Sequence, residues 1–211
     1  MKTTITIFIA GFLLGGLALN QVFLHKMTST PVATLADGGE YFGEMTNGVL
    51  QGYGEMKWPD GMHYKGYFNN GLFHGEGRMV YSTGESYEGV FTKGEITGFG
   101  EFIYSENSHY KGELLSNLMD GSGTFVDKNG EYTGQFKENL FQGVGSYLHA
   151  NGDTYSGMYH QGQYHGTGIY VESDGDQYSG DFIGGSFTGQ GLHKAADGSE
   201  YQGEFDNWNY H

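Results

Sequence analysis

The stretch Tyr64-Lys65-Gly66-Tyr67-Phe68-Asn69-Asn70-Gly71-Leu72-Phe73-His74-Gly75-Glu76-Gly77 contains the pattern that dictates the architecture of this chain. Its opening motif, Tyr-x-Gly, returns along the sequence with a period of 23 residues, which is shortened once to 22. The motif begins at Tyr41, Tyr64, Tyr87, Tyr110, Tyr132, Tyr155, Tyr178 and Tyr201. A fixed period of this length indicates an array of repeats in which each unit buries its apolar face on its neighbours.

Alternation of residue types within a unit predicts β-strands. In the first unit Tyr41, Gly43 and Met45 share one parity, and a second segment from Leu50 to Trp58 alternates in the same way. Period-two alternation places such residues on one face of a strand and the intervening polar residues on the other. We therefore expect two strands in every unit.

Short turn motifs separate the predicted strands. Inside the units they include Asn47-Gly48, Asn70-Gly71, Lys93-Gly94 and Gln161-Gly162, and between units Asp60-Gly61, Asn129-Gly130, Asn151-Gly152, Asp174-Gly175 and Asp197-Gly198. Asn-Gly and Asp-Gly favour type I′ turns, because both central residues of that turn need a positive φ. The predicted fold class is all-β: an elongated, single-layer antiparallel meander of β-hairpin repeats, preceded by one N-terminal hydrophobic helix.

Each unit carries a Gly-x-Gly pair in its second predicted strand, and these are the candidate structural glycines. The ten singled out are Gly52, Gly54, Gly75, Gly77, Gly98, Gly100, Gly143, Gly145, Gly166 and Gly168. A glycine inside a strand weakens the sheet unless another group must approach the backbone closely. We expect tyrosine and phenylalanine rings to lie flat over these pairs, each buried ring contributing roughly 1.5–3 kcal/mol.

The composition restricts the chemistry available to the chain. Its 211 residues include 39 glycines and no cysteine, so disulfides, thiolate nucleophiles and cysteine-ligated zinc sites are excluded. All 25 acidic residues lie within residues 37–211 against eight basic ones, which gives this part a net charge of −17. Such a surface is expected to repel nucleic acid and anionic lipid head groups.

Residues 1–26 form a hydrophobic N-terminal segment that has two interpretations. As a membrane anchor, residues 5–24 supply roughly the 20 positions that a helix needs to cross a bilayer. As a signal peptide, the segment has a basic Lys2, an apolar stretch and a small-x-small cleavage site at Gly16-Leu17-Ala18. Residues 27–36 are interpreted as a polar spacer, and residues 37–211 as an array of about seven repeats with a C-terminal partial repeat or cap.

The charges that flank the hydrophobic segment predict its orientation. The α-amino group and Lys2 precede it, whereas Lys26 follows it, so the positive-inside tendency favours a cytoplasmic N-terminus. The predicted location is a single-pass membrane anchor with an extracytoplasmic repeat domain. The alternative is a secreted or periplasmic protein after cleavage of the signal peptide.

The repeated pattern Tyr-x-Gly-x-Phe-x-x-Gly-x-x-x-Gly-x-Gly closely resembles the MORN repeat, and the resemblance covers residues 41–206. Met45 and Leu114 replace the aromatic residue of the pattern. Asn117 and Asn139 replace a turn glycine, a change that asparagine tolerates because it adopts a left-handed conformation. The resemblance implies an extended antiparallel β-sheet used for membrane association, protein scaffolding or self-association.

Candidate catalytic and metal-binding residues do not form a recognisable motif. His74 and His165 occupy equivalent slots beside Gly-x-Gly, where other units carry unrelated residues. The stretch Asp127-Lys128-Asn129-Gly130-Glu131 resembles the opening of a calcium loop but lacks the glutamate at the twelfth position. Glu113 and Asp120 are the carboxylates on which hydrolysis would be tested. We predict no catalytic residue, no metal, no cofactor and no enzymatic activity.

The function predicted from these observations is that of a non-enzymatic, membrane-tethered or exported scaffold that binds a protein partner or its own copy. The candidate binding-surface aromatics are Tyr64, Phe68, Tyr87, Phe91, Tyr155, Tyr159, Tyr178 and Phe182. A phospholipid-contacting module is the first alternative, although the negative charge makes anionic head groups doubtful partners. A glycan-binding repeat protein of the cell envelope is the second. Contact with the membrane is expected through residues 5–24, and no nucleic-acid partner is expected.

Overall fold

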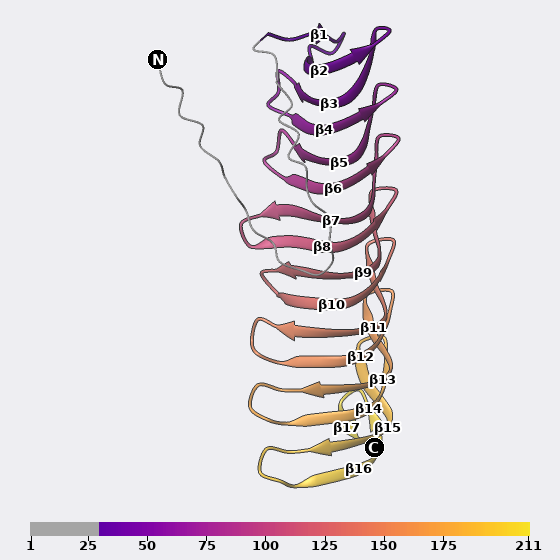
Figure 1. Ribbon diagram of the computed structural model, residues 1–211. Helices are drawn as coiled ribbons and strands as arrows, with labels where there is room; N and C mark the ends of the chain where they lie inside the picture. Colours follow the sequence, from indigo (N-terminus) through magenta and orange to yellow (C-terminus); the bar gives the residue numbers. More distant parts are fainter. Residues whose placement is uncertain (1–29) are drawn as a thin grey trace, which may run out of the picture.

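The computed structural model describes residues 30–211, which form a single antiparallel sheet of 17 strands (Figure 1). Each strand pairs with the next one along the chain, so the described part of the sheet is a continuous meander, as predicted. The hydrophobic helix expected in residues 1–26 lies outside the described residues. Within residues 30–211 no helix is long and apolar enough to cross a membrane.

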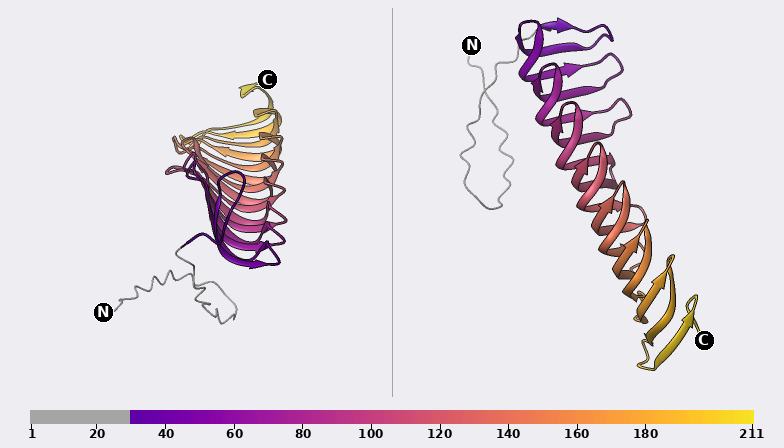
Figure 2. Two further views of the ribbon diagram at one scale, coloured as in Figure 1. Left: turned by 90° about the horizontal axis from the view of Figure 1, so that it is seen from above. Right: turned by 90° about the vertical axis from the view of Figure 1, so that its right-hand side faces the viewer.

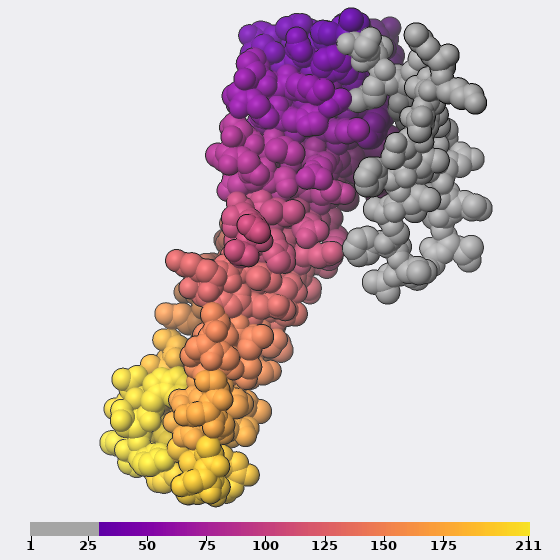
Figure 3. Space-filling model, turned by 90° about the vertical axis from the view of Figure 1, so that its left-hand side faces the viewer, coloured from indigo at the N-terminus to yellow at the C-terminus, as the bar shows by residue number. Residues whose placement is uncertain are grey.

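The strands stack into an elongated sheet, with β1 and β2 at one end and β16 and β17 at the other (Figure 1 and Figure 3). Their bounds are β1 Ala33–Thr34, β2 Glu40–Thr46, β3 Val49–Lys57, β4 His63–Asn69, β5 Leu72–Val80, β6 Ser86–Thr92, β7 Glu95–Ser105, β8 Ser108–Leu115, β9 Leu118–Asp127, β10 Gly130–Lys137, β11 Leu140–His149, β12 Thr154–His160, β13 Gln163–Val171, β14 Gln177–Ile183, β15 Ser186–Lys194, β16 Glu200–Asp206 and β17 Asn209–Tyr210. The short strand β1 lies inside the stretch interpreted as a spacer and pairs with β2.

The turns inside the units have the predicted type I′ character, because both central residues have a positive φ. These pairs are Asn47-Gly48, Asn70-Gly71, Lys93-Gly94, Ser116-Asn117, Glu138-Asn139, Gln161-Gly162, Gly184-Gly185 and Asn207-Trp208. Asn117 and Asn139, which replace a glycine, have φ values of 67° and 69°. The left-handed conformation expected of these two asparagines is therefore confirmed.

The turns between units differ from the predicted type I′. At Asp60-Gly61 only the glycine has a positive φ, of 91°, and the Gly61 amide donates to the carbonyl of Trp58 at 3.1 Å. The same asymmetry holds for the other Asn-Gly and Asp-Gly motifs between units. At Gly61, Gly152, Gly175 and Gly198 the physical reason is that the connection has four or five residues, so a glycine in the left-handed region closes the turn after ordinary residues. Gly130 differs, because it is already the first residue of β10 and follows a two-residue connection.

Each hairpin contains a β-bulge at the first glycine of its Gly-x-Gly pair. Between β2 and β3, Gly43 pairs with Gly54 and Glu44 with Gln51, so Gly52 and the residue after it have no partner across that hairpin. Gly52 has a φ of 69°, which an L-residue with a side chain rarely adopts. The bulge bends the hairpin, so the sheet has an inner face and an outer face (Figure 2).

The inner face of the bend contains the hydrophobic core. Tyr64 and Phe68 are four residues apart on β4, which would separate them by about 13 Å in a flat strand, yet their ring centroids lie 5.2 Å apart. Tyr64 also stacks on Phe73 at 4.0 Å. Eighteen apolar side chains are buried in this core within residues 30–211, which is unusual for a sheet with only one layer.

An aromatic ring covers the second glycine of each pair, as expected: the repeat tyrosine in the first six units, and Phe187 over Gly191 in the seventh. A Cβ added at Gly77 would lie 2.5 Å from the Tyr64 hydroxyl, and one at Gly145 would lie equally close to the Tyr132 hydroxyl. The hydroxyl then donates to the carbonyl three residues ahead, for example from Tyr132 to Gln135 at 2.8 Å. The prediction that rings cover both glycines was wrong for the first glycine of each pair. That glycine has a positive φ and forms the β-bulge instead.

The C-terminal end of the sheet is closed by the segment expected to be a cap. Strand β17 pairs with the end of β16, through Phe205 with Tyr210. Between the two strands, Trp208 packs against Phe187 with ring centroids 5.8 Å apart. This aromatic contact covers the last part of the inner face.

Candidate interaction surface

The eight aromatic residues predicted as a binding surface lie on the inner face of the sheet. Seven of them are buried in the core, with at most 3 % of the side chain exposed: Tyr64, Phe68, Tyr87, Phe91, Tyr155, Tyr159 and Phe182. The eighth, Tyr178, is half-buried and stacks on His193 at 4.3 Å. The bend of each hairpin turns these rings inward, so they stabilise the array and present no surface to a partner.

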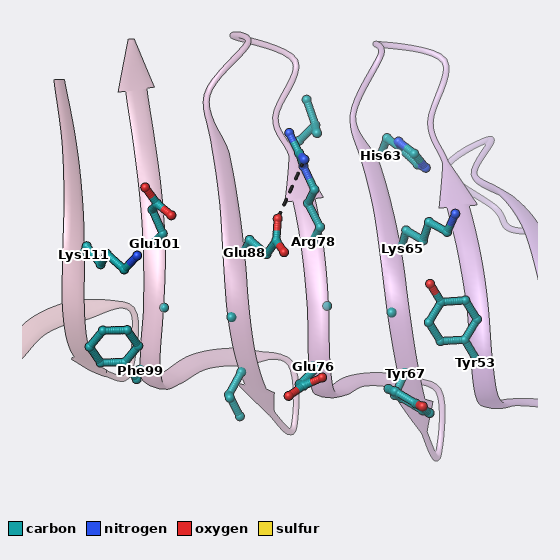
Figure 4. Close-up of a pocket in the computed structure, with 16 residues that line it drawn as sticks. Tyr53, His63, Lys65, Tyr67, Glu76, Arg78, Glu88, Phe99, Glu101 and Lys111 are labelled. Carbon is teal, nitrogen blue, oxygen red and sulfur yellow. Dashed lines mark ion pairs between the residues drawn. The ribbon is translucent and has the colours of Figure 1, made fainter. Parts of the chain in front are cut away.

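The outer face carries the side chains that a partner can reach. One row on this face is formed by the residue that follows each repeat tyrosine and by its neighbours across the strands. On β3 to β8 this row consists of Glu55, Lys65, Arg78, Glu88, Glu101 and Lys111, which are successive register partners. We name these six side chains the charged ladder; most of them are labelled in Figure 4.

A shallow hollow runs along the outer face beside the charged ladder (Figure 4). Its other wall includes Tyr67, Glu76 and Phe99, and glycines such as Gly77 and Gly89 line it between the two rows. The glycines provide no side chains here because the bend requires them, so the hollow follows directly from the repeat pattern. It crosses the strands and has no deep enclosed part.

Ion pairs connect parts of the charged ladder. Arg78 Nη1 lies 3.7 Å from Glu88 Oε2, and both side chains are exposed. At the ladder's first position, partial burial opposes ionisation, but the hydrogen bond and charge of Lys57, 3.2 Å away, hold the pKa of Glu55 below its ordinary value. The Glu55 carboxylate is thus held in the ionised form that electrostatic recognition requires.

The outer face changes character beyond β9. Along the same row, the charged residues give way to hydroxyl side chains such as Ser146 and Ser156. Exposed apolar side chains lie around them on β11, β12 and β13. We define the apolar patch as Val144, Leu148, Met158 and Ile169, all of which are exposed. Val144 and Met158 are direct register partners, with 62 % and 41 % of their surface accessible.

Comparison with known protein families places the repeat in a defined class. A family model described as the MORN repeat matches seven consecutive segments, which together cover residues 41–200. The chain belongs to the MORN repeat family. Every MORN unit begins at a Tyr of the Tyr-x-Gly motif, and the fourth, residues 110–131, is the short one. The repeat boundaries predicted from the sequence are therefore confirmed.

Two solved structures share the extended β-sheet only loosely. The SAS-4 (dCPAP) TCP domain of Drosophila melanogaster, in complex with a proline rich motif of Ana2 (dSTIL), is 13 % identical, with a TM-score of 0.44 over 90 % of this chain and 96 % of that one. The TCP10c domain of Drosophila melanogaster Sas-4 is also 13 % identical, with a TM-score of 0.40 over 84 % and 97 %. No curated protein matches the sequence. At these scores the likenesses carry no inference about function.

The sixth MORN unit departs from the others at Tyr159. Equivalent positions hold phenylalanine at Phe68, Phe91 and Phe136, whereas the Tyr159 hydroxyl is buried and has no hydrogen-bond partner. Burial raises the pKa of Tyr159 far above its ordinary value. Sequence reasoning missed this feature, although the departure from phenylalanine is visible in the alignment of the repeats.

Tyr159→Phe is expected to stabilise the chain by about 1 kcal/mol, because it removes a buried, unsatisfied hydroxyl and keeps the ring. Thermal and denaturant unfolding of the two proteins would measure this difference. Tyr155→Phe is the matched control, since the Tyr155 hydroxyl donates to the carbonyl of Met158 at 2.9 Å and its loss should destabilise. A destabilised Tyr159→Phe variant would show that the hydroxyl has a partner after all.

The carboxylates considered for chemistry take part in local structural contacts. Asp120 forms an ion pair with Lys137 at 2.8 Å, and Glu113 accepts a hydrogen bond from the Ser122 amide at 3.3 Å. Asp127 accepts from the Asn129 amide at 2.8 Å and so shapes a turn. Within the part of the chain that the structure describes, no three histidine or acidic side chains are grouped closely enough to hold a metal ion.

Hydrogen bonds between histidine, tyrosine and aspartate gather on the inner face near the C-terminal end. His149 contacts the Tyr164 hydroxyl through Nε2, and Tyr170 donates to Asp153 at 2.6 Å. The hydrogen bond from Tyr170, followed by that from the Ser173 amide, lowers the pKa of Asp153 to about 2. These contacts bridge successive units, so they fix the stacking of hairpins.

Proposed function

We propose that this chain is a non-enzymatic MORN-repeat scaffold that holds a protein partner on the apolar patch of its outer face. The observation that supports the proposal is the exposure of Val144 and Met158, directly opposite each other on β11 and β12. On soluble proteins, larger contiguous apolar patches with polar residues around them mark contact sites. The inner face supports the same conclusion, because its rings are already buried against each other.

The patch suits a protein surface better than a lipid head group or a nucleic acid. Its neighbours along the strands are hydroxyl residues, Ser146 and Ser156, which can hydrogen-bond to a partner at the rim. A central apolar area with a polar rim is the usual arrangement of protein–protein contacts, and Glu131, the register partner of Leu148, lies at the edge of the patch. The net charge of −17 on residues 37–211 opposes anionic membranes and nucleic acid.

The proposal includes a tether. Residues 5–24 form an apolar segment long enough to cross a bilayer as a helix, and the flanking charges favour export of the array. In this arrangement the chain holds its partner at the extracytoplasmic side of a membrane. After signal cleavage the same array would be released as a soluble scaffold.

Site-specific photo-crosslinking in the native cell tests the scaffold proposal. A crosslinking amino acid at position 144 of the full chain should capture one defined protein, whereas the same group at Gln202, an exposed outer-face position on β16, should not. Val144→Asp should then reduce the capture through position 158 by about tenfold or more, as expected for the centre of an interface. Identical products from positions 144 and 202, or none, would contradict the proposal.

A further inference from the structure

The signs of the charged ladder follow a definite order from β3 to β8. They run negative at Glu55, positive at Lys65 and Arg78, negative at Glu88 and Glu101, and positive at Lys111. Two of the five neighbouring pairs thus place like charges directly opposite each other: Lys65 with Arg78, and Glu88 with Glu101. Such cross-strand pairs are unfavourable within an isolated sheet.

When the ladder is read in the reverse direction, every charge has the opposite sign to the charge at the same place in the forward order. Read from β8 back to β3, the ladder is positive, negative, negative, positive, positive and negative, the opposite of the forward order at each of the six positions. A two-fold axis that lies parallel to the strands, between β5 and β6, performs this reversal and turns the outer faces of two copies toward each other. Lys65 then faces Glu101 of the other copy, and Arg78 faces Glu88.

We propose that the charged ladder is a docking surface for a second copy of this chain, which binds in the antiparallel orientation that this two-fold axis defines. The proposal goes beyond the proposed scaffold function, because it adds a second copy of the chain as a partner on a separate surface. Docking places the carboxylates of Glu101 and Glu88 over the basic pair, Lys65 and Arg78, in both directions across the interface. The juxtaposition that is unfavourable in one copy becomes complementary in two.

The charges also exclude the neighbouring arrangements. Moving the axis by one strand spacing, to lie between β4 and β5, would bring Lys65 against Arg78 of the other copy. Moving it to lie between β6 and β7 would bring Glu88 against Glu101. An orientation without reversal would place each charged residue against its own equivalent. Only one register pairs all six positions with opposite charges, and like-charge repulsion is what makes such a surface specific.

The residues beside the ladder fit the same operation. The axis exchanges β4 with β7, which carry Tyr67 and Phe99 with 43 % and 58 % of their surface exposed. Two apolar rings thereby lie at corresponding positions of the facing copies. At the ends of the ladder, uncharged Phe42 on β2 exchanges with uncharged Thr124 on β9. Like charges therefore do not face each other in the charged ladder or in the row that contains Tyr67, Glu76 and Phe99.

The paired arrangement leaves the apolar patch free. Under this axis β10 of one copy faces β1 of the other, so β11 to β13 extend past the N-terminal end of the facing sheet. An antiparallel pair would therefore present two apolar patches, one at each end. The scaffold contact and the self-contact use different halves of the outer face, and each can be tested without the other.

Cysteine crosslinking of the full chain in neutral detergent tests the geometry directly, because the natural sequence has no cysteine. Mixing a Lys65→Cys protein with a Glu101→Cys protein should give a mixed disulfide dimer under mild oxidation. Lys65→Cys alone should crosslink much less, since the two copies of position 65 would lie three strand spacings, about 14 Å, apart. Equal yields of like and mixed dimers would overturn the proposed register.

Charge exchange tests the electrostatic origin. Lys65→Glu should weaken dimerisation by about tenfold, measured by sedimentation, and Lys65→Glu combined with Glu101→Lys should restore it, because both facing positions change sign. Lys128→Glu, an equal charge change at an exposed turn, is the control. Dimerisation should also fall at 1 M salt, where screening acts within about 3 Å.

A chain that remains monomeric, or a dimer unaffected by Lys65→Glu, would overturn this inference. Neither result would affect crosslinking from position 144, which tests the partner on the apolar patch. A dimer that forms while position 144 captures nothing would support the ladder and remove the scaffold contact.

Discussion

Gly145→Val is expected to lower the free energy of unfolding by about 3 kcal/mol, because the new side chain would overlap a ring that cannot move away. A Cβ at this position would lie 2.5 Å from the Tyr132 hydroxyl oxygen and 2.6 Å from a ring carbon. The ring is fixed from above by Phe141, which stacks on it with centroids 3.8 Å apart. Gly54→Val should act in the same way through Tyr41.

Thermal unfolding measures the effect, and a loss of this size corresponds to a melting temperature lower by roughly 6–12 °C for a protein of this length. Ser146→Val is the matched control, because it adds the same side chain to the adjacent, exposed position on the outer face. It should change stability by less than about 0.5 kcal/mol.

A double-mutant cycle isolates the ring as the cause. In a Tyr132→Ala background the space above Gly145 is vacated, so Gly145→Val should cost much less than in the natural sequence. An equal cost in both backgrounds would show that the backbone, rather than the covering ring, requires glycine at this position.

The period and the alternation were sufficient to predict the sheet, the hairpins and the positions of the units. Each depends on local chemistry: the tyrosine recurs with its glycine two places later, and turn pairs such as Asn47-Gly48 require positive φ. The covering of Gly54 by an aromatic ring also followed from sequence, since a glycine in a strand needs a close neighbour.

The location of the aromatic rings was not predictable from alternation alone. A flat single-layer sheet would leave Tyr64 and Phe68 exposed on one face, which is why they were expected to form a binding surface. The bulge at the first glycine of each pair bends the strand and buries them. A Gly-x-Gly pair in every unit is the sequence signal for that bend, but its two glycines must be assigned different roles.

The charged ladder required the register of the strands. Lys65 and Arg78 are separated by 13 positions in the sequence, and only the hairpin pairing places them side by side. Once the bulge is known, the ladder can be read from the residue after each repeat tyrosine and its partner on the next strand. The sequence contains the alternation of signs, but it becomes visible only after the sheet is built.

Alkaline pH is expected to unfold the whole array cooperatively between pH 10 and about 12. Burial raises the pKa of Tyr41, Tyr87, Tyr132 and Tyr155 to about 12 from the ordinary value of 10. A pKa that is higher in the folded state means that the stabilisation is complete below pH 10 and is lost as the pH rises through 12.

The sum of these losses, about 8–12 kcal/mol, is comparable with the total stability of a typical domain. Each of the four hydroxyls forfeits up to about 2–3 kcal/mol by pH 12, whereas folded domains are stable by about 5–15 kcal/mol in total. Circular dichroism and the ultraviolet absorbance of phenolate should therefore change together. Phenolate formation near pH 10 with the sheet intact would mean that solvent reaches the rings.

The free energy of unfolding of the Tyr132→Phe variant and that of the natural chain, each measured as a function of pH, should give curves that cross. At neutral pH the variant loses the hydrogen bond from the hydroxyl to the Gln135 carbonyl, 2.8 Å long, and should be less stable by about 1 kcal/mol. Above pH 11 the natural chain loses the stabilisation of its neutral phenol, which the variant never had, so the variant becomes the more stable of the two. Curves that remain parallel would show that Tyr132 does not titrate on unfolding, because only a group with different pKa values in the two states changes the slope.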